Sequence, residues 1–94
     1  MEEKGDREGR MEERAIGVVV RYFAKIGVAA IRITEGELKV GDRIRIKGHS
    51  TDLEEEIESM QVEHENVQMV GAGTDVGIKV KERVREHDVI YLLT

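Results

Sequence analysis

The chain has 94 residues, a mass of 10.7 kDa and a formal net charge of −5, and 39% of its residues are apolar. This length suffices for one small domain and excludes a nucleotide hydrolase, a dehydrogenase or a protease with a binding cleft of its own. The sequence has no cysteine, which excludes disulfides, thiolate zinc sites and cysteine nucleophiles.

Charge is distributed unevenly along the chain. Residues 15–47 carry a net charge of +4, whereas residues 48–75 hold eight acids and no lysine or arginine. Strong nonspecific binding of nucleic acid needs clustered lysine and arginine, because the bound cations must neutralise phosphates. The overall balance therefore argues against such binding and leaves room for a local basic face.

The sequence shows no targeting or membrane segment. No apolar run follows the N-terminal Met-Glu-Glu-Lys, and the longest apolar stretches have about four or five residues, against about 20 for a membrane-spanning helix. We therefore expect a cytoplasmic protein without membrane contact. A composition rich in glutamate, lysine, arginine, valine and isoleucine also suits a heat-adapted source.

The first 14 residues differ from the rest of the chain. They alternate charged residues with glycines and present no face to bury, which is typical of a flexible arm. The sequence therefore predicts an arm at residues 1–14 and a single domain at residues 15–94.

The domain begins with two predicted strands. Residues 16–23 are β-branched and aromatic with apolar side chains on both faces, which predicts a strand covered on both sides. Residues 25–27 supply a turn, and residues 28–34 form a second strand with one apolar face, made of Ala29, Ile31 and Ile33.

Later segments repeat this pattern. Residues 43–47 alternate most clearly, with Ile44 and Ile46 inward and with three bases outward, Arg43, Arg45 and Lys47. Further strands are predicted at residues 76–80 and 89–93. Turn signals recur about every ten residues, which is typical of a small all-β sandwich or barrel.

Residues 52–64 fit two structures. Apolar residues at helical spacing, with Asp52 and Glu55 placed as a capping box, favour a helix. A strand requires a change of frame, because Ile57 and Met60 have opposite parity, and a bulge near Glu58-Ser59 would supply it. The residues alone leave both structures open.

Four blocks of the sequence together resemble the second domain of translational GTPases such as elongation factor Tu. In residues 28–47 a strand, a glycine turn, the stretch Leu38-Lys-Val-Gly-Asp42 and an alternating strand follow one another. Residues 56–67 resemble the next strand of that domain, residues 72–78 its glycine turn and strand, and residues 81–92 its closing stretch. The sequence departs from the family at His87-Asp88, where a glycine often begins the final turn.

The resemblance implies an all-β fold, namely a six-stranded closed antiparallel β-barrel of the translation-factor domain II type, with residues 52–64 as a strand. Closure would remove the exposed sheet edges that so many β segments otherwise create. Because only the charged arm precedes the barrel, we expect a free-standing copy of the domain without its GTPase. In translation factors this barrel contacts ribosomal RNA, charged tRNA ends or partner domains.

Two glycine-containing segments superficially suggest phosphate binding. Gly71-Ala-Gly73 and Gly77 lack the helix start that a dinucleotide site requires, because residues 76–80 have a strand pattern. The stretch Lys47-Gly-His-Ser-Thr51 has His49 in place of the lysine of a P-loop. We therefore predict tight turns here, with no nucleotide and no other cofactor.

No catalytic or metal-binding arrangement is visible. The three histidines, His49, His64 and His87, are widely separated, and their spacing does not indicate a metal site. Ser50 and Ser59 have no motif of a nucleophile around them, and the acidic run of residues 54–56 is typical of a solvated face. We predict that the chain is not an enzyme and binds no metal.

The charged strands permit two interpretations. If residues 43–47 pair with the acidic segment beyond the loop, bases meet Glu54, Glu56 and Glu58 across the ladder, and each pair contributes about 0.2–1 kcal/mol. Alternatively, the bases of two strands and the segment after them form a stripe that binds RNA phosphates. The residues of this predicted RNA site are Arg43, Arg45, Lys47, Lys79, Lys81, Arg83 and Arg85.

The sequence therefore supports two functional hypotheses. The first is a non-enzymatic, translation-factor-like barrel that binds ribosomal RNA, tRNA or a ribonucleoprotein through its outward basic face. The second is a protein-interaction module, the accessory domain of an enzyme or complex on another chain, and the acidic block at residues 48–75 motivates it.

Overall fold

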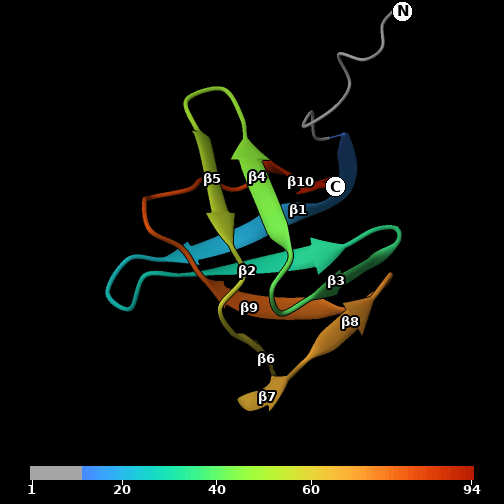
Figure 1. Ribbon diagram of the computed structural model, residues 1–94. Helices are drawn as coiled ribbons and strands as arrows, with labels where there is room; N and C mark the ends of the chain where they lie inside the picture. Colours follow the sequence, from blue (N-terminus) through green and yellow to red (C-terminus); the bar gives the residue numbers. More distant parts are fainter. Residues whose placement is uncertain (1–11) are drawn as a thin grey trace, which may run out of the picture.

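The computed structural model describes residues 12–94 and shows ten β-strands and no helix in that range (Figure 1). The predicted all-β class is confirmed. The strands are β1 (Glu13–Phe23), β2 (Val28–Ile33), β3 (Glu37–Lys39), β4 (Arg43–Lys47), β5 (Asp52–Glu56), β6 (Met60–Val62), β7 (Glu65–Val67), β8 (Met69–Gly71), β9 (Asp75–Lys79) and β10 (Val89–Leu93).

Eight of these strands form one antiparallel sheet in the order β5-β4-β10-β1-β2-β9-β6-β7, and β3 pairs with β8 in a second, smaller sheet. All five strands predicted from alternating or apolar runs are present. Of the three-residue strands, β6 falls within the strand alternative for residues 52–64, whereas β3, β7 and β8 had no separate prediction, because so few residues show no periodicity. The helix proposed as one alternative for residues 52–64 is wrong, and the strand alternative is right.

The segment from β5 to β6 shows how the frame changes. Leu53, Glu55 and Ile57 point inward, then Glu58 and Ser59 are both exposed, and Met60 is buried again. The change therefore falls where a bulge was predicted. In this segment β5 pairs with β4 and β6 pairs with β9. One short stretch of chain therefore pairs with strands near both ends of the sheet order.

The pairing order of the large sheet has two ends, β5 and β7. Two backbone hydrogen bonds also attach the β5–β6 link to the turn before β4. The Ile57 N–H donates to Asp42 O at 2.8 Å, and the Gly41 N–H donates to Ile57 O at 2.8 Å. The strand pairing does not join the two ends of this order, so closure of six strands into a barrel stays a prediction.

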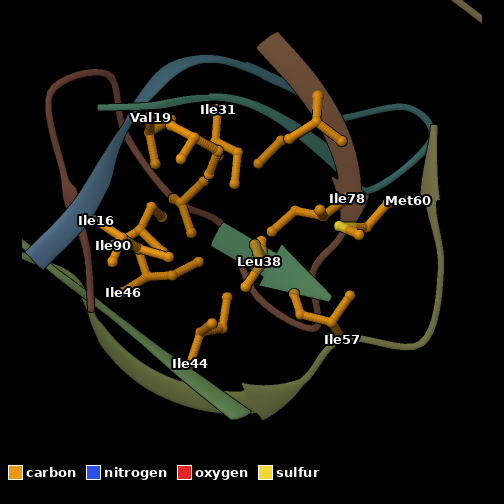
Figure 2. Close-up of a cluster of buried hydrophobic side chains, with 14 of the residues drawn as sticks. Ile16, Val19, Ile31, Leu38, Ile44, Ile46, Ile57, Met60, Ile78 and Ile90 are labelled. Carbon is orange, nitrogen blue, oxygen red and sulfur yellow. The ribbon is translucent and has the colours of Figure 1, made fainter. Parts of the chain in front are cut away.

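The core lies inside the curve of the sheet and consists mainly of isoleucines, as Figure 2 shows. Ile16, Ile31, Ile46 and Ile90 have no solvent exposure, and Leu38 of β3 lies among them. β-branched side chains suit this position because their restricted rotamers pack well on a pleated surface. The charged residues of β4 and β5 lie on the outside, except Glu55, which points inward.

The first strand departs from its prediction. Residues 16–23 were expected to be covered on both faces, but Val20 and Phe23 are each 40% exposed. A bulge between Val19 and Arg21 shifts the register, so Val19 and Tyr22 point toward the core and the residues between them do not. The outer face of β1 is therefore uncovered here.

The described residues begin close to the predicted boundary between the arm and the domain. Of the proposed arm at residues 1–14, residues 1–11 lie outside the described residues. The last part of that segment is paired, because β1 begins at Glu13 and Glu12 exchanges two backbone hydrogen bonds with Thr94, at 2.8 and 3.0 Å.

In the described part of the chain, no helix is long and apolar enough to cross a membrane.

Candidate functional site

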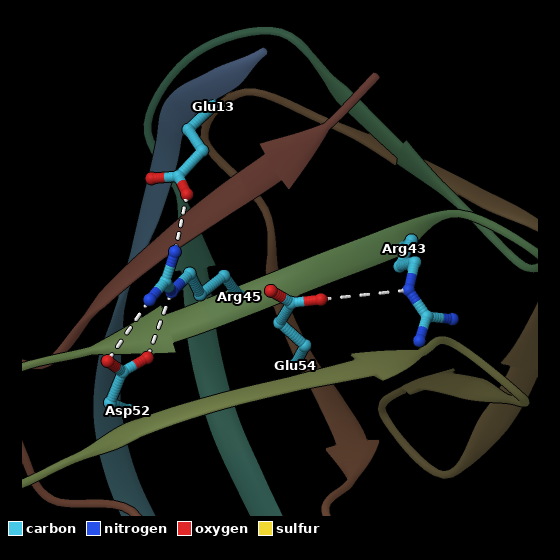
Figure 3. A network of polar contacts seen from close by, with 5 residues as sticks. All are labelled: Glu13, Arg43, Arg45, Asp52 and Glu54. Atoms are coloured by element: carbon cyan, nitrogen blue, oxygen red, sulfur yellow. Dashed lines mark hydrogen bonds and ion pairs between the residues drawn. The ribbon is translucent and has the colours of Figure 1, made fainter. Parts of the chain in front are cut away.

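The hairpin of β4 and β5 brings bases and acids together, as predicted (Figure 3). The direct cross-strand partners are Arg43 with Glu56, Arg45 with Glu54 and Lys47 with Asp52. The ion pairs, however, are diagonal. Arg45 contacts Asp52 at 2.9 Å, and Arg43 lies 3.9 Å from Glu54. Diagonal contacts of this kind are within reach of long side chains on a twisted antiparallel pair.

Arg45 is the centre of this network. Its Nε and Nη2 donate to the two carboxylate oxygens of Asp52 at 2.9 and 3.1 Å, and its Nη1 donates to Glu13 of β1 at 2.7 Å. These hydrogen bonds raise the pKa of Arg45 and hold the pKa of the Asp52 carboxyl below its ordinary value. The guanidinium of Arg45 is therefore occupied by two carboxylates.

Three other predicted bases surround one open pocket of about 370 Å³, at the free edge of β5 and the end of β9. Arg43, Lys79 and Lys81 lie there, so the structure does bring the two basic segments together. Three carboxylates lie in the same pocket. Its lining is Arg43, Glu55, Glu56, Glu58, Lys79, Val80 and Lys81, three bases against three acids.

Glu55 is the functional candidate that sequence reasoning missed. Only 4% of this residue is exposed, and its Oε1 accepts a hydrogen bond from the Lys81 N–H at 2.9 Å. Burial raises the pKa of the Glu55 carboxyl, against the opposing effect of that hydrogen bond. The acidic run suggested a solvated face, but the alternation of Leu53, Glu55 and Ile57 was a signal that Glu55 points inward.

The remaining predicted bases lie elsewhere. Arg83 and Arg85 line a second pocket of about 310 Å³ together with Tyr22, Val84 and Glu86. Lys47 is exposed at the end of β4. The seven proposed RNA-binding residues are thus distributed over an ion-paired hairpin, a charge-balanced pocket and the segment before β10.

Asp88 organises that last segment, although the sequence indicated it only as part of a departure from the family pattern. It is 4% exposed, and its Oδ2 accepts a hydrogen bond from the Arg85 N–H at 2.8 Å. The residue before it, His87, has a φ of 78°, a left-handed conformation that explains why glycine is common here in the family the sequence resembles.

The three histidines lie in separate turns and are exposed. Within residues 12–94 no group of three or more histidine, aspartate or glutamate side chains is placed to hold a metal ion. The backbone supports the turn prediction for the glycine-containing segment, because Gly73 has a φ of 89° and precedes strand β9 rather than a helix.

Comparison with protein families agrees with this fold. The family model of elongation factor Tu domain 2 matches residues 27–89, which confirms the resemblance drawn from the sequence. The C-terminal domain of a putative U32 peptidase from Geobacillus thermoleovorans has a similar structure, with a TM-score of 0.77 and 20% sequence identity over 85% of this chain and 91% of that one. A selenomethionine form of the same domain gives the same TM-score at 19% identity, covering 82% of this chain and 96% of that chain.

Two curated proteins share more sequence with this chain. An uncharacterized protease of Methanocaldococcus jannaschii is 43% identical over 79 residues, which are 83% of this chain and 19% of the protease. A collagenase of Porphyromonas gingivalis is 35% identical over 85 residues, which are 88% of this chain and 24% of the collagenase. The chain thus spans about a fifth to a quarter of the length of these relatives.

Proposed function

This chain belongs to the elongation factor Tu domain 2 family, and we propose that it acts as a non-catalytic accessory module of a U32-type peptidase. The observation that carries the proposal is the 43% identity with a segment that makes up only 19% of a protease. A segment of that size leaves about four fifths of the protease unmatched, and we propose that the peptidase active site lies in that unmatched part.

The surface of the chain favours this role over the alternative of RNA binding. Phosphate contacts require bases that are free to replace counterions. Arg45 instead binds two carboxylates, and the pocket that holds Arg43, Lys79 and Lys81 contains an equal number of glutamates. Such a mixed surface is better suited to the polar rim of a protein interface, where charges of both signs fix register and orientation.

We further propose that the sheet closes into the six-stranded barrel of the family through the segment of residues 52–62. The pairing path from β5 through β4, β10, β1, β2 and β9 returns to β6, which only three residues separate from β5. The two hydrogen bonds of Ile57 and the bond from Lys81 to Glu55 support this closure. A closed barrel would give the module a rigid surface on which to present an interface.

A binding experiment with defined components tests the proposed function. The purified 94-residue chain is titrated calorimetrically with the purified catalytic region of a U32-type peptidase from the same source organism. We expect saturable binding in the micromolar range or tighter. A chain that shows no heat of binding and does not change the rate of peptide cleavage would contradict the proposal.

The same preparation is assayed against bulk tRNA and ribosomal RNA fragments at low and high salt. We expect no salt-sensitive retention of RNA. RNA binding that weakens steeply with salt, together with loss of binding in an Arg83→Gln, Arg85→Gln variant, would favour the RNA hypothesis. The chain alone, incubated with the peptidase substrate, is expected to cleave nothing.

A further inference from the structure

The outer face of β1, β2 and β9 differs from the ion-paired face of β4 and β5. These three strands lie side by side, as Figure 1 shows. Directly opposed residues in an antiparallel sheet share a face. Phe23 pairs with Val28, and Arg21 pairs with Ala30, which in turn pairs with Gly77 of β9. The outward positions Phe23, Val28, Ala30 and Gly77 are therefore apolar or small, and Arg21 and Lys79 lie at the ends of their rows.

The apolar character continues past the end of β1. Ile26, in the turn that joins β1 to β2, is 64% exposed, and its N–H donates to Phe23 O at 3.3 Å. Val20 at the β1 bulge adds a third exposed apolar side chain. We call the set Val20, Phe23, Ile26, Val28, Ala30 and Gly77 the hairpin face.

A shallow hollow extends the hairpin face toward β6. It has a volume of about 100 Å³ and is lined in part by Val28, Gly77 and Gln61. Gly77 leaves this space open because it has no side chain, and a Cβ there would lie 3.5 Å from the Val28 side chain. The hollow is of a size to receive a small apolar side chain from a partner.

Cations border the hairpin face. The guanidinium of Arg21 lies 5.8 Å from the centre of the Phe23 ring, Lys25 lies in the turn and Lys79 ends the row of Phe23 and Val28. Among residues 12–94, no carboxylate lies within ion-pair distance of these three side chains, but Lys79 also lines the pocket that holds three glutamates, so Arg21 and Lys25 are the cations that belong to this face alone. By contrast, Arg32 at the far end of the face is paired with Asp75 at 2.7 Å.

We propose that the hairpin face is the surface by which the module docks on the peptidase, against an apolar patch bordered by carboxylates. The inference rests on the proposed function and specifies its interface. Its basis is charge complementarity, because an apolar centre bordered by the cations of Arg21 and Lys25 matches a partner surface that carries carboxylates. Exposed apolar side chains grouped on one sheet face also mark interaction sites more often than isolated ones do.

Point variants with matched controls test the docking surface. Ile26→Glu places an acid in the centre of the face, at a turn residue that the core does not need. Met69→Glu is the control, because Met69 of β8 is 53% exposed and lies off the face. Lys25→Glu tests the cationic border against Lys39→Glu of β3. Circular dichroism melts establish that each variant is folded.

We expect Ile26→Glu and Lys25→Glu each to weaken binding to the peptidase catalytic region at least tenfold, and the two controls to bind as the unaltered chain does. If the unaltered chain binds and Ile26→Glu binds equally well, the docking surface is wrong and the proposed function stands. If the unaltered chain does not bind, the proposed function fails and the docking surface fails with it. Binding of bulk tRNA that Lys25→Glu abolishes and Ile26→Ala leaves intact would overturn a protein interface in favour of RNA.

Discussion

Glu55 of β5 accepts a hydrogen bond from the backbone N–H of Lys81 at 2.9 Å, across the gap between the free edge of β5 and the end of β9. A buried carboxylate thus satisfies a backbone donor that no neighbouring strand pairs. This arrangement stabilises the wall of the pocket, and it makes the stability of the domain sensitive to the charge of one side chain.

We expect Glu55→Gln to change the pH dependence of stability. Because burial raises the Glu55 pKa above its ordinary value of 4.5, the folded chain holds the proton more tightly than the unfolded chain does. The resulting stability is fully present below pH 4.5 and is lost as the pH rises through the raised pKa. Glutamine keeps an acceptor and cannot ionise, so the variant should lack this loss.

The measurement is the melting temperature between about pH 4 and about pH 8, a range that brackets the ordinary carboxyl pKa. The difference between Glu55→Gln and the unaltered chain should grow in favour of the variant toward high pH. Glu56→Gln, at an exposed neighbour on β5, is the matched control for the loss of one carboxylate. Parallel pH curves for Glu55→Gln and the unaltered chain would contradict the prediction.

Arg45→Gln is expected to lower the melting temperature more than Arg43→Gln does. Arg45 binds carboxylates on two other strands, whereas the nearest carboxylate to Arg43 is 3.9 Å away. The loss should shrink in about 1 M salt, where charges are screened beyond about 3 Å. Equal effects of the two substitutions at low salt would show that the bidentate contact adds nothing.

The Arg45→Gln variant should also change how the stability of the fold depends on pH in the acidic range. Because Arg45 lowers the pKa of Asp52, the pair stabilises the fold above pH 3.8, and this contribution is lost as the pH falls through the lowered pKa. The unaltered chain and Arg45→Gln should therefore converge in stability toward low pH. Urea denaturation at a series of acidic pH values measures this, with Arg43→Gln as the reference.

Gly48→Ala should destabilise the domain by about 1–3 kcal/mol, the usual range for overpacking. A Cβ at this position would collide with the Asp88 carboxylate, which is buried and held by the Arg85 N–H. Gly71→Ala is the control, because its Cβ would meet nothing within 4 Å, and it should change the free energy of unfolding by less than about 0.5 kcal/mol. Urea denaturation measures the free energy of unfolding of both variants. A Gly48→Ala variant that unfolds at the same urea concentration as the unaltered chain would show that the Asp88 carboxylate moves aside without loss of stability.

Replacing Glu63-His64 with Asn-Gly should stabilise the hairpin of β6 and β7. These two residues form its loop, and their φ values are 51° and 71°. A two-residue loop with positive φ at both positions favours Asn-Gly, and left-handed backbone costs other residues about 1–2 kcal/mol each. We expect a gain of about 1 kcal/mol in thermal or urea unfolding. Asn-Gly at Glu65-Asn66, within β7, should destabilise the fold instead.

The longer strands could be predicted because their side chains alternate in sequence. Ile44 and Ile46 point inward in β4 for the reason their spacing suggested, and the frame change at Glu58 and Ser59 follows from parity alone. The exposed side of β1 could not be predicted, since the bulge at Val19 depends on the register in which β1 pairs with β2, and side-chain alternation does not report that register.

The candidate site was less predictable than the fold. The meeting of bases and acids across β4 and β5 needed only the order of the residues. The alternation around Glu55 indicated that it points inward, but its partner, the Lys81 N–H, lies 26 residues away and no pattern identifies it. Asp88 likewise packs against Gly48, a contact that only the fold creates. Sequence patterns report which face a residue takes, and they do not report which distant backbone group it will meet.

The two hydrogen bonds between Glu12 and Thr94 place both ends of the described chain at one corner of the molecule, beside the start of β1. A protein could therefore carry this domain as an insertion in a surface loop, entering and leaving through the same opening. The turn at residues 24–27 lies at the other end of β1. A larger protein joined to this domain at Glu12 and Thr94 would leave the turn at residues 24–27 exposed, so that it could contact another part of that protein.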